Sequence, residues 1–144
     1  MARSQGWQRN PNAYPFGTVT ETRFQDLDPL GHINNVAMAA LFENGRVRFN
    51  RHLALENWQP GERWLVASVT IDYVAEAHFP DPLEVRSGIG RVGTSSWDIY
   101  SAAFQCGHCV AVCQTTLVLT NAAGPAPMSD GLRQCFAQLM VSHP

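Results

Sequence analysis

Two aspartates, a histidine and two asparagines crowd into one short stretch between Asp26 and Asn35. A carboxylate such as Asp28 can remove a proton from water or attack a carbonyl carbon as a nucleophile. The first N–H groups of a helix have no partner inside the helix and carry partial positive charge, so a helix that begins near Asn35 can stabilise an oxyanion. The stretch therefore combines a base or nucleophile with an oxyanion donor.

The elements that must position this stretch are predicted in the order strand, long helix, four strands, short helix. Alternation and a high content of threonine and valine predict a strand at 18–24. The segment 35–55 has no proline, and Asn34 or Asn35 can cap its start, which predicts one long helix. Further strands are predicted at 64–75, 83–92, 96–106 and 109–120, and a short helix from Ser129 or Asp130 to 139.

These elements predict an α+β protein. Four successive strands with short connections favour an antiparallel meander. The first half of the long helix is apolar on nearly every face until Glu43, so we expect a curved antiparallel sheet to wrap around it, which is the hotdog fold. Residues 1–17 contain prolines and no periodicity and are expected to form a loose N-terminal arm, followed by a single domain over 18–144.

Composition excludes several classes of protein. The chain has 144 residues, of which 45% are hydrophobic and 15% charged, which fits one compact domain and excludes disorder as the main state. A net charge of -2 disfavours nucleic acid and anionic membranes as partners. The longest apolar run, Val36 to Phe42, is too short to span a bilayer, and the N-terminus has no signal-peptide core, so a cytoplasmic protein is expected. One helix on a sheet with open edges predicts a homodimer or homotetramer.

Three of the four cysteines lie close together in QCGHCVAVC. Cys106, His108 and Cys109 could contribute to a metal site, but a structural zinc needs four ligands and the chain offers no second pair with suitable spacing. These residues instead fit the flanks of a hairpin turn. We therefore expect reduced thiols, no metal and no other cofactor.

The motif D-x-D-P-x-G-H-x-N-N-V, followed by F-E-N-G-R, resembles acyl-CoA thioesterases of the hydroxybenzoyl-CoA thioesterase-like hotdog superfamily. The resemblance continues through DPLEVRSGIGRVGTSSWDIYSAAF and covers most of the chain. It implies that Asp28, which precedes Pro-x-Gly, carries catalysis, and that the backbone N–H of Asn35 is the oxyanion donor. Asp26 matches no catalytic position of that family.

Plant acyl-ACP thioesterases have a similar motif, whose aspartate, asparagine and histidine correspond to Asp28, Leu30 and His32. Leu30 removes the middle polar partner, but Asp28 and His32 can still act together as catalytic residues, with His32 positioning the loop or a water. An aspartate before Pro-x-Gly can also simply shape a turn. Whether Asp28 activates water or attacks the thioester stays open at this level.

The resemblance implies a binding role for Arg91, Ser95 and Ser96, around a turn that in the family approaches the nucleotide or pantetheine end of coenzyme A. Arginine and hydroxyl groups suit phosphate, although an ordinary hairpin with a solvent-facing arginine has the same residues.

Two further residues are expected to support the site. Asn34 is a good helix cap, and Glu43 can pair with Arg46 three residues later, although family members place a carboxylate near the pocket at this point.

The expected function is acyl-CoA thioesterase activity, which releases a carboxylic acid and free coenzyme A. An acyl-ACP thioesterase and a non-catalytic module that binds acyl thioesters are the alternatives. A hotdog dehydratase is disfavoured, because its His-Phe-Pro motif precedes the central helix whereas His78 follows the second strand here.

Overall fold

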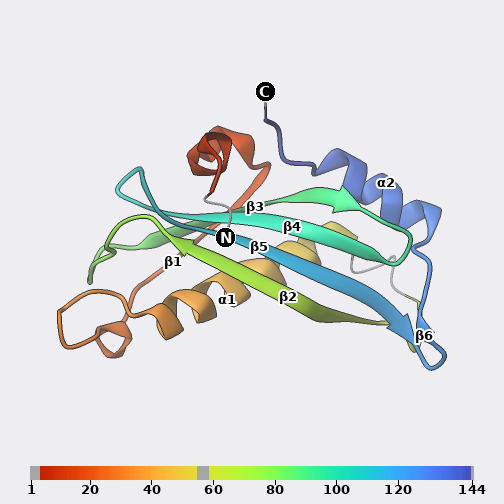
Figure 1. Ribbon diagram of the computed structural model, residues 1–144, viewed down its shortest axis with the longest axis horizontal. Coiled ribbons are helices and arrows are strands. Elements are labelled where there is room, and N and C mark those ends of the chain that lie inside the picture. The colour runs from red at the N-terminus through yellow and green to blue at the C-terminus, as the bar shows by residue number, and fades with distance from the viewer. Residues whose placement is uncertain (1–3, 55–58, 144) are drawn as a thin grey trace.

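An antiparallel sheet curls around one long helix in the computed structural model, which describes residues 4–54 and 59–143 (Figure 1). The helix is α1 (Asn35–Ala54), and a second helix, α2 (Asp130–Gln138), follows the sheet and is capped by the side chain of Ser129. The strand order is β1 (Phe16–Thr20), β3 (Leu83–Val92), β4 (Ser96–Gln105), β5 (His108–Asn121) and β2 (Arg63–Tyr73), with the short β6 (Gly124–Pro125) beside β5. The predicted hotdog fold is confirmed.

The predicted meander is wrong at its first connection. β2 pairs with β5 at the far edge of the sheet and not with β3, its successor in the sequence. The connecting loop, 74–82, crosses the ends of β5 and β4 on its way to β3. The amide of Gln105 holds this loop in place by accepting the N–H of His78 at 2.8 Å and donating to the carbonyls of His78 and Asp81.

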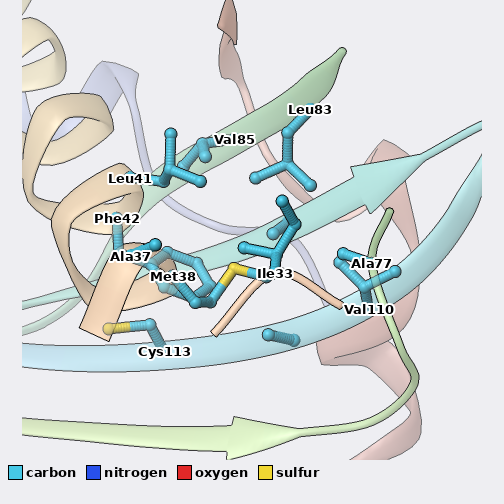
Figure 2. Close-up of a cluster of buried hydrophobic side chains, with 12 residues drawn as sticks. Ile33, Ala37, Met38, Leu41, Phe42, Ala77, Leu83, Val85, Val110 and Cys113 are labelled. Carbon is cyan, nitrogen blue, oxygen red and sulfur yellow. The ribbon is translucent and has the colours of Figure 1, made fainter. Parts of the chain in front are cut away.

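The core lies between α1 and the concave face of the sheet (Figure 2). Met38 and Phe42 on α1 are almost fully buried against strand residues that include Val85 and Cys113. At Gly45 an added Cβ would lie 2.6 Å from a methyl of Val85, so only glycine permits this approach of helix to sheet. Gly45 therefore lets α1 lie close to β3.

The sheet wraps around α1 as predicted, but one face of α1 and the edge strand β2 remain uncovered. Val36 and Val47 on α1 are 74% and 48% exposed, and Val66 and Val69 on β2 are 48% and 46% exposed. α1 packs mainly on β1, β3 and β4, which leaves the β2 side of the concave face open. No helix among the described residues is long and apolar enough to cross a membrane.

The N-terminal arm is packed against the convex face and is not loose as predicted. It forms two short 3-10 helices, Gly6–Arg9 and Pro11–Ala13. The Tyr14 hydroxyl donates to the carbonyl of Gln8 at 2.6 Å, and Tyr14 packs in a cluster with residues of β4 and β5. The arm packs there because apolar side chains are buried on this second face of the sheet. Its sequence has no hydrophobic periodicity, so this packing was not predicted.

Candidate active site

Asp28 sits at the start of a tight turn that ends at His32. Its N–H donates to the carbonyl of His32 at 2.8 Å, and its carboxylate Oδ1 accepts the N–H groups of Leu30 and His32 at 2.9 and 3.2 Å. Gly31 has a φ of 81°, which a glycine adopts without strain. Asp28 Oδ2 has no hydrogen-bond partner among the described residues, and the side chain is half-buried. The turn therefore fixes one carboxylate oxygen and leaves the other available for chemistry.

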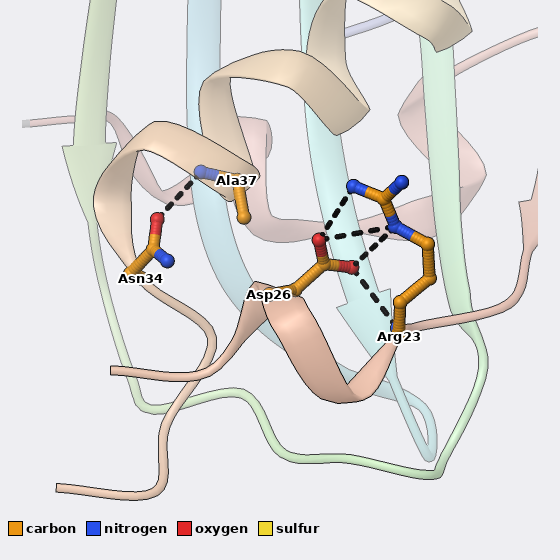
Figure 3. A network of polar contacts seen from close by, with 4 residues as sticks. All are labelled: Arg23, Asp26, Asn34 and Ala37. Atoms are coloured by element: carbon orange, nitrogen blue, oxygen red, sulfur yellow. Dashed lines mark hydrogen bonds and ion pairs between the residues drawn. The ribbon is translucent and has the colours of Figure 1, made fainter. Parts of the chain in front are cut away.

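Asp26, only two residues earlier, is fully committed to structure (Figure 3). It ends a 3-10 turn, Phe24–Asp26, and is 3% exposed. Its carboxylate accepts hydrogen bonds from both the backbone and the guanidinium of Arg23, the shortest at 2.8 Å. The hydrogen bond from the Arg23 side chain lowers the pKa of Asp26. Asp26 thus anchors the loop that presents Asp28.

The N-terminus of α1 lies directly after this turn. The side-chain oxygen of Asn34 accepts the N–H of Ala37 at 2.7 Å (Figure 3). The Asn34 carbonyl accepts the N–H of Met38. Asn34 is therefore the predicted cap. The N–H groups of Asn35 and Val36 donate no hydrogen bond within the described residues, so they can bind an anion or a developing oxyanion.

The crossing loop brings a second carboxylate to the site. Glu76 Oε2 lies 3.1 Å from Nε2 of His32, and the ring of His78 stands edge-on to His32 with centroids 5.3 Å apart. The loop is tied to the turn by the N–H of Ile33, which donates to the carbonyl of Ala77 at 2.8 Å. A carboxylate at this distance orients the imidazole and favours one tautomer.

Sequence reasoning missed Glu76, and it offered Tyr73 only as one of several aromatic residues that could line the pocket or belong to the core. The Tyr73 hydroxyl, at the end of β2, donates to the carbonyl of Asn35 at 3.3 Å. Both residues come about forty positions after the motif. They lie next to it only because β2 pairs with β5 and not with β3. A carboxylate just beyond a strand end, in a loop rich in proline, was the available signal.

Arg91, Ser95 and Ser96 are not brought to Asp28 within one chain. Arg91 is near the end of β3, Ser95 is in the turn that follows, and Ser96 begins β4. The ten residues of β4 span about 30 Å from this turn to the end of the sheet where Asp28 lies. Arg91 Nε lies 3.3 Å from Asp98, and its Nη2 donates to the Ser96 hydroxyl at 3.1 Å. Asp98 also accepts the hydroxyl of Thr116 at 2.7 Å. The predicted group for coenzyme A is thus a paired network at the opposite end of the sheet.

Glu43 and Arg46 form the predicted ion pair, at 3.8 Å, with Glu43 largely in solvent and Arg46 buried. Arg46 also donates to the hydroxyl of Thr115 at 3.4 Å. Glu43 therefore contacts a residue of its own helix and not Asp28.

Cys106 and Gly107 form the predicted hairpin turn between β4 and β5, and both residues have positive φ. Cys106, Cys109 and Cys113 form no disulfide among the described residues. Among the described residues, no group of three or more His, Cys, Asp or Glu side chains is placed to hold a metal ion.

Comparison with known proteins identifies the family to which this chain belongs. The sequence matches the thioesterase-like superfamily over residues 22–136, so the chain belongs to that superfamily. It is 26% identical over 96 residues to the uncharacterized protein YsmA of Bacillus subtilis (strain 168). That match covers 67% of this chain and 63% of YsmA, so it spans less than two thirds of that relative.

Solved structures share the fold over nearly their whole length. The PA5185 protein of Pseudomonas aeruginosa strain PAO1 is 27% identical and superposes with a TM-score of 0.81, over 92% of this chain and 96% of that one. A thioesterase of Thermus thermophilus, solved in complex with coenzyme A and Zn, is 26% identical with a TM-score of 0.78, over 88% and 94% of the two chains.

Proposed function

We propose that this protein hydrolyses acyl-CoA thioesters to a carboxylic acid and free coenzyme A, with Asp28 as base or nucleophile. The observation that carries the proposal is the free Asp28 Oδ2 in a rigid turn, next to a helix N-terminus with two unused N–H groups. Membership of the thioesterase-like superfamily supports thioester hydrolysis as the class of reaction. The coenzyme A bound to the Thermus thermophilus thioesterase supports coenzyme A as the carrier.

In the proposed reaction, the thioester carbonyl oxygen lies against the N–H groups of Asn35 and Val36. Asp28 either takes a proton from the attacking water or attacks the carbonyl carbon to give a mixed anhydride, which water then cleaves. In both routes the C–S bond breaks and the thiolate leaves, to be protonated to the free thiol. His32, held by Glu76, orients the turn and the attacking water.

A single-turnover reaction in H₂¹⁸O detects the anhydride route when water cleaves the anhydride at the aspartyl carbonyl, because ¹⁸O then stays in the peptide that contains Asp28. Activation of water, and cleavage of the anhydride at the acyl carbonyl, both put the label in the released acid, and a peptide that carries the acyl group on Asp28 separates these two cases. Mass spectrometry of the digested protein and of the product gives the answer.

We also propose that the working unit is a homodimer joined through β2. This strand is an open edge with exposed Leu65, Val66 and Val69, the kind of edge that monomeric proteins protect. A two-fold copy paired antiparallel along β2 would direct the partner's opposite sheet end toward the Asp28 end of the first chain. In that arrangement Arg91, Ser95 and Ser96 of one chain serve the site of the other.

Light scattering tests this assembly. The wild type is expected to have twice the mass of one chain, and Val69→Asp on the uncovered face of β2 is expected to halve it. Thr120→Asp, at the other end of the sheet on β5, serves as control. A monomeric wild type would overturn the dimer and with it the shared site.

Thiol release by the purified wild type tests the function. Short, long and aromatic acyl-CoAs, together with one acyl-ACP, cover the substrate classes. Turnover of at least one acyl-CoA, lost in Asp28→Ala, is expected at neutral pH with the thiols of the protein reduced. Turnover of acyl-ACP alone would show that the carrier is acyl carrier protein and not coenzyme A. Binding without any turnover would indicate a binding module.

A further inference from the structure

Tyr73 connects the edge strand to the start of the central helix. It is the last residue of β2 and lies opposite Ala111 of the buried core cluster, so its side chain is on the concave face, toward α1. Its hydroxyl donates to the carbonyl of Asn35 at 3.3 Å, and its side chain is still 54% exposed. An exposed tyrosine therefore holds the first turn of a helix that otherwise packs on β1, β3 and β4.

The carbonyl that Tyr73 contacts belongs to the same peptide unit as the N–H of Val36. A hydrogen bond to a carbonyl polarises its peptide unit and makes the N–H of that unit a stronger donor. The Val36 N–H is one of the two groups at this helix start that have no partner in the described chain. The contact at Asn35 thus acts on a donor that faces the site and not on one already used in the helix.

We infer that Tyr73 is a positioning residue that fixes and polarises the Asn35–Val36 peptide, so that the Val36 N–H joins that of Asn35 in binding the thioester oxygen. This inference rests on the proposed function and deepens it. Burial, with a smaller contribution from the Cys113 thiol, raises the pKa of Tyr73, so the hydroxyl remains a donor at neutral pH. Since Tyr73 ends the strand proposed as the subunit interface, formation of the dimer would also fix the oxyanion donors.

Tyr73→Phe removes the hydroxyl and keeps the ring. We expect kcat to fall by about threefold to tenfold, the effect of one neutral hydrogen bond, with an unchanged KM and the same fall for every acyl chain. Tyr100→Phe is the matched control, because Tyr100 lies on the convex face beside Trp7, away from the helix start.

A second readout needs no turnover. In the ¹H–¹⁵N spectrum of the free protein, the Val36 amide proton is expected to shift upfield in Tyr73→Phe and to stay in place in Tyr100→Phe. Wild-type turnover combined with an unmoved Val36 resonance and unchanged kcat in folded Tyr73→Phe would overturn only the role of Tyr73. A rise in KM at unchanged kcat would also overturn it, because the hydroxyl would then bind substrate directly. A wild type with no thioesterase activity would overturn the proposed function and the catalytic role of Tyr73 with it.

Discussion

The two ends of the sheet both carry polar residues that suit thioester chemistry, yet they use them differently. At the Ser96 end, Arg91 and Thr116 both donate hydrogen bonds to Asp98, which is 5% exposed. At the Asp28 end, one carboxylate oxygen and two helix N–H groups have no partner in the described chain. Polar groups that satisfy each other stabilise the fold, whereas groups left with spare hydrogen-bonding capacity next to an opening can act on a substrate.

The contrast recurs on a smaller scale between the two aspartates of the motif. Asp26 is buried and held by Arg23, while Asp28 is half-buried with one free oxygen. Residue type alone would rank them equally. Their hydrogen bonds separate an anchor from a candidate catalyst.

Substitutions of His32 and Glu76 test whether the polar groups at the Asp28 end act on a substrate. Glu76→Gln and His32→Gln are each expected to lower kcat by on the order of 10-fold to 100-fold, because the turn and the attacking water lose their alignment. The double variant should lose little more than either single one, since the residues act together. Glu21→Gln, another exposed carboxylate, is the control, and equal losses in it would remove the special role of Glu76.

Asp26→Asn tests the structural role of Asp26 through its effect on the stability of the fold. Arg23 lowers the pKa of Asp26 in the folded state, so the ion pair adds stability above the unfolded pKa of about 3.9, and this contribution is lost as the pH falls through the folded value. Arg23 lies largely in solvent, which weakens the pair, so a loss of about 1 kcal/mol in the free energy of unfolding is expected at pH 7.

Urea unfolding at pH 7 and at pH 3 measures this effect. The difference between Asp26→Asn and the wild type should shrink at the lower pH. A difference that grows on acidification would contradict the assignment of Asp26 as an ionised anchor.

Arg91→Ala gives the smallest expected change. If Arg91 of the partner subunit contacts a phosphate of coenzyme A, the KM should rise by no more than about fivefold, because the guanidinium is half exposed and shared with Asp98. The kcat should stay constant. Arg51→Ala changes an exposed arginine in the last turn of α1 and is the control. An equal rise in KM in both variants would show that Arg91 contributes only its positive charge and no specific contact.

The local parts of this molecule could be predicted from sequence, and the non-local parts could not. The helix cap at Asn34, the pair of Glu43 with Arg46 and the close approach at Gly45 follow from spacing and residue size. The placement of β2 beside β5 depends on which edge offers the better packing surface, which no spacing rule encodes. Glu76 and Tyr73 reach the site only through that placement, so their contacts with His32 and Asn35 could not be predicted.

The most direct test of the central claim compares Asp28→Asn with Asp26→Asn, two identical changes two residues apart. Thiol release is measured at saturating concentration of the acyl-CoA that the wild type turns over fastest, after circular dichroism has shown both variants to be folded. We predict that kcat falls by roughly 10² to 10⁴-fold in Asp28→Asn and stays close to the wild type in Asp26→Asn. Wild-type turnover in folded Asp28→Asn, or an equal loss in both variants, would contradict the account.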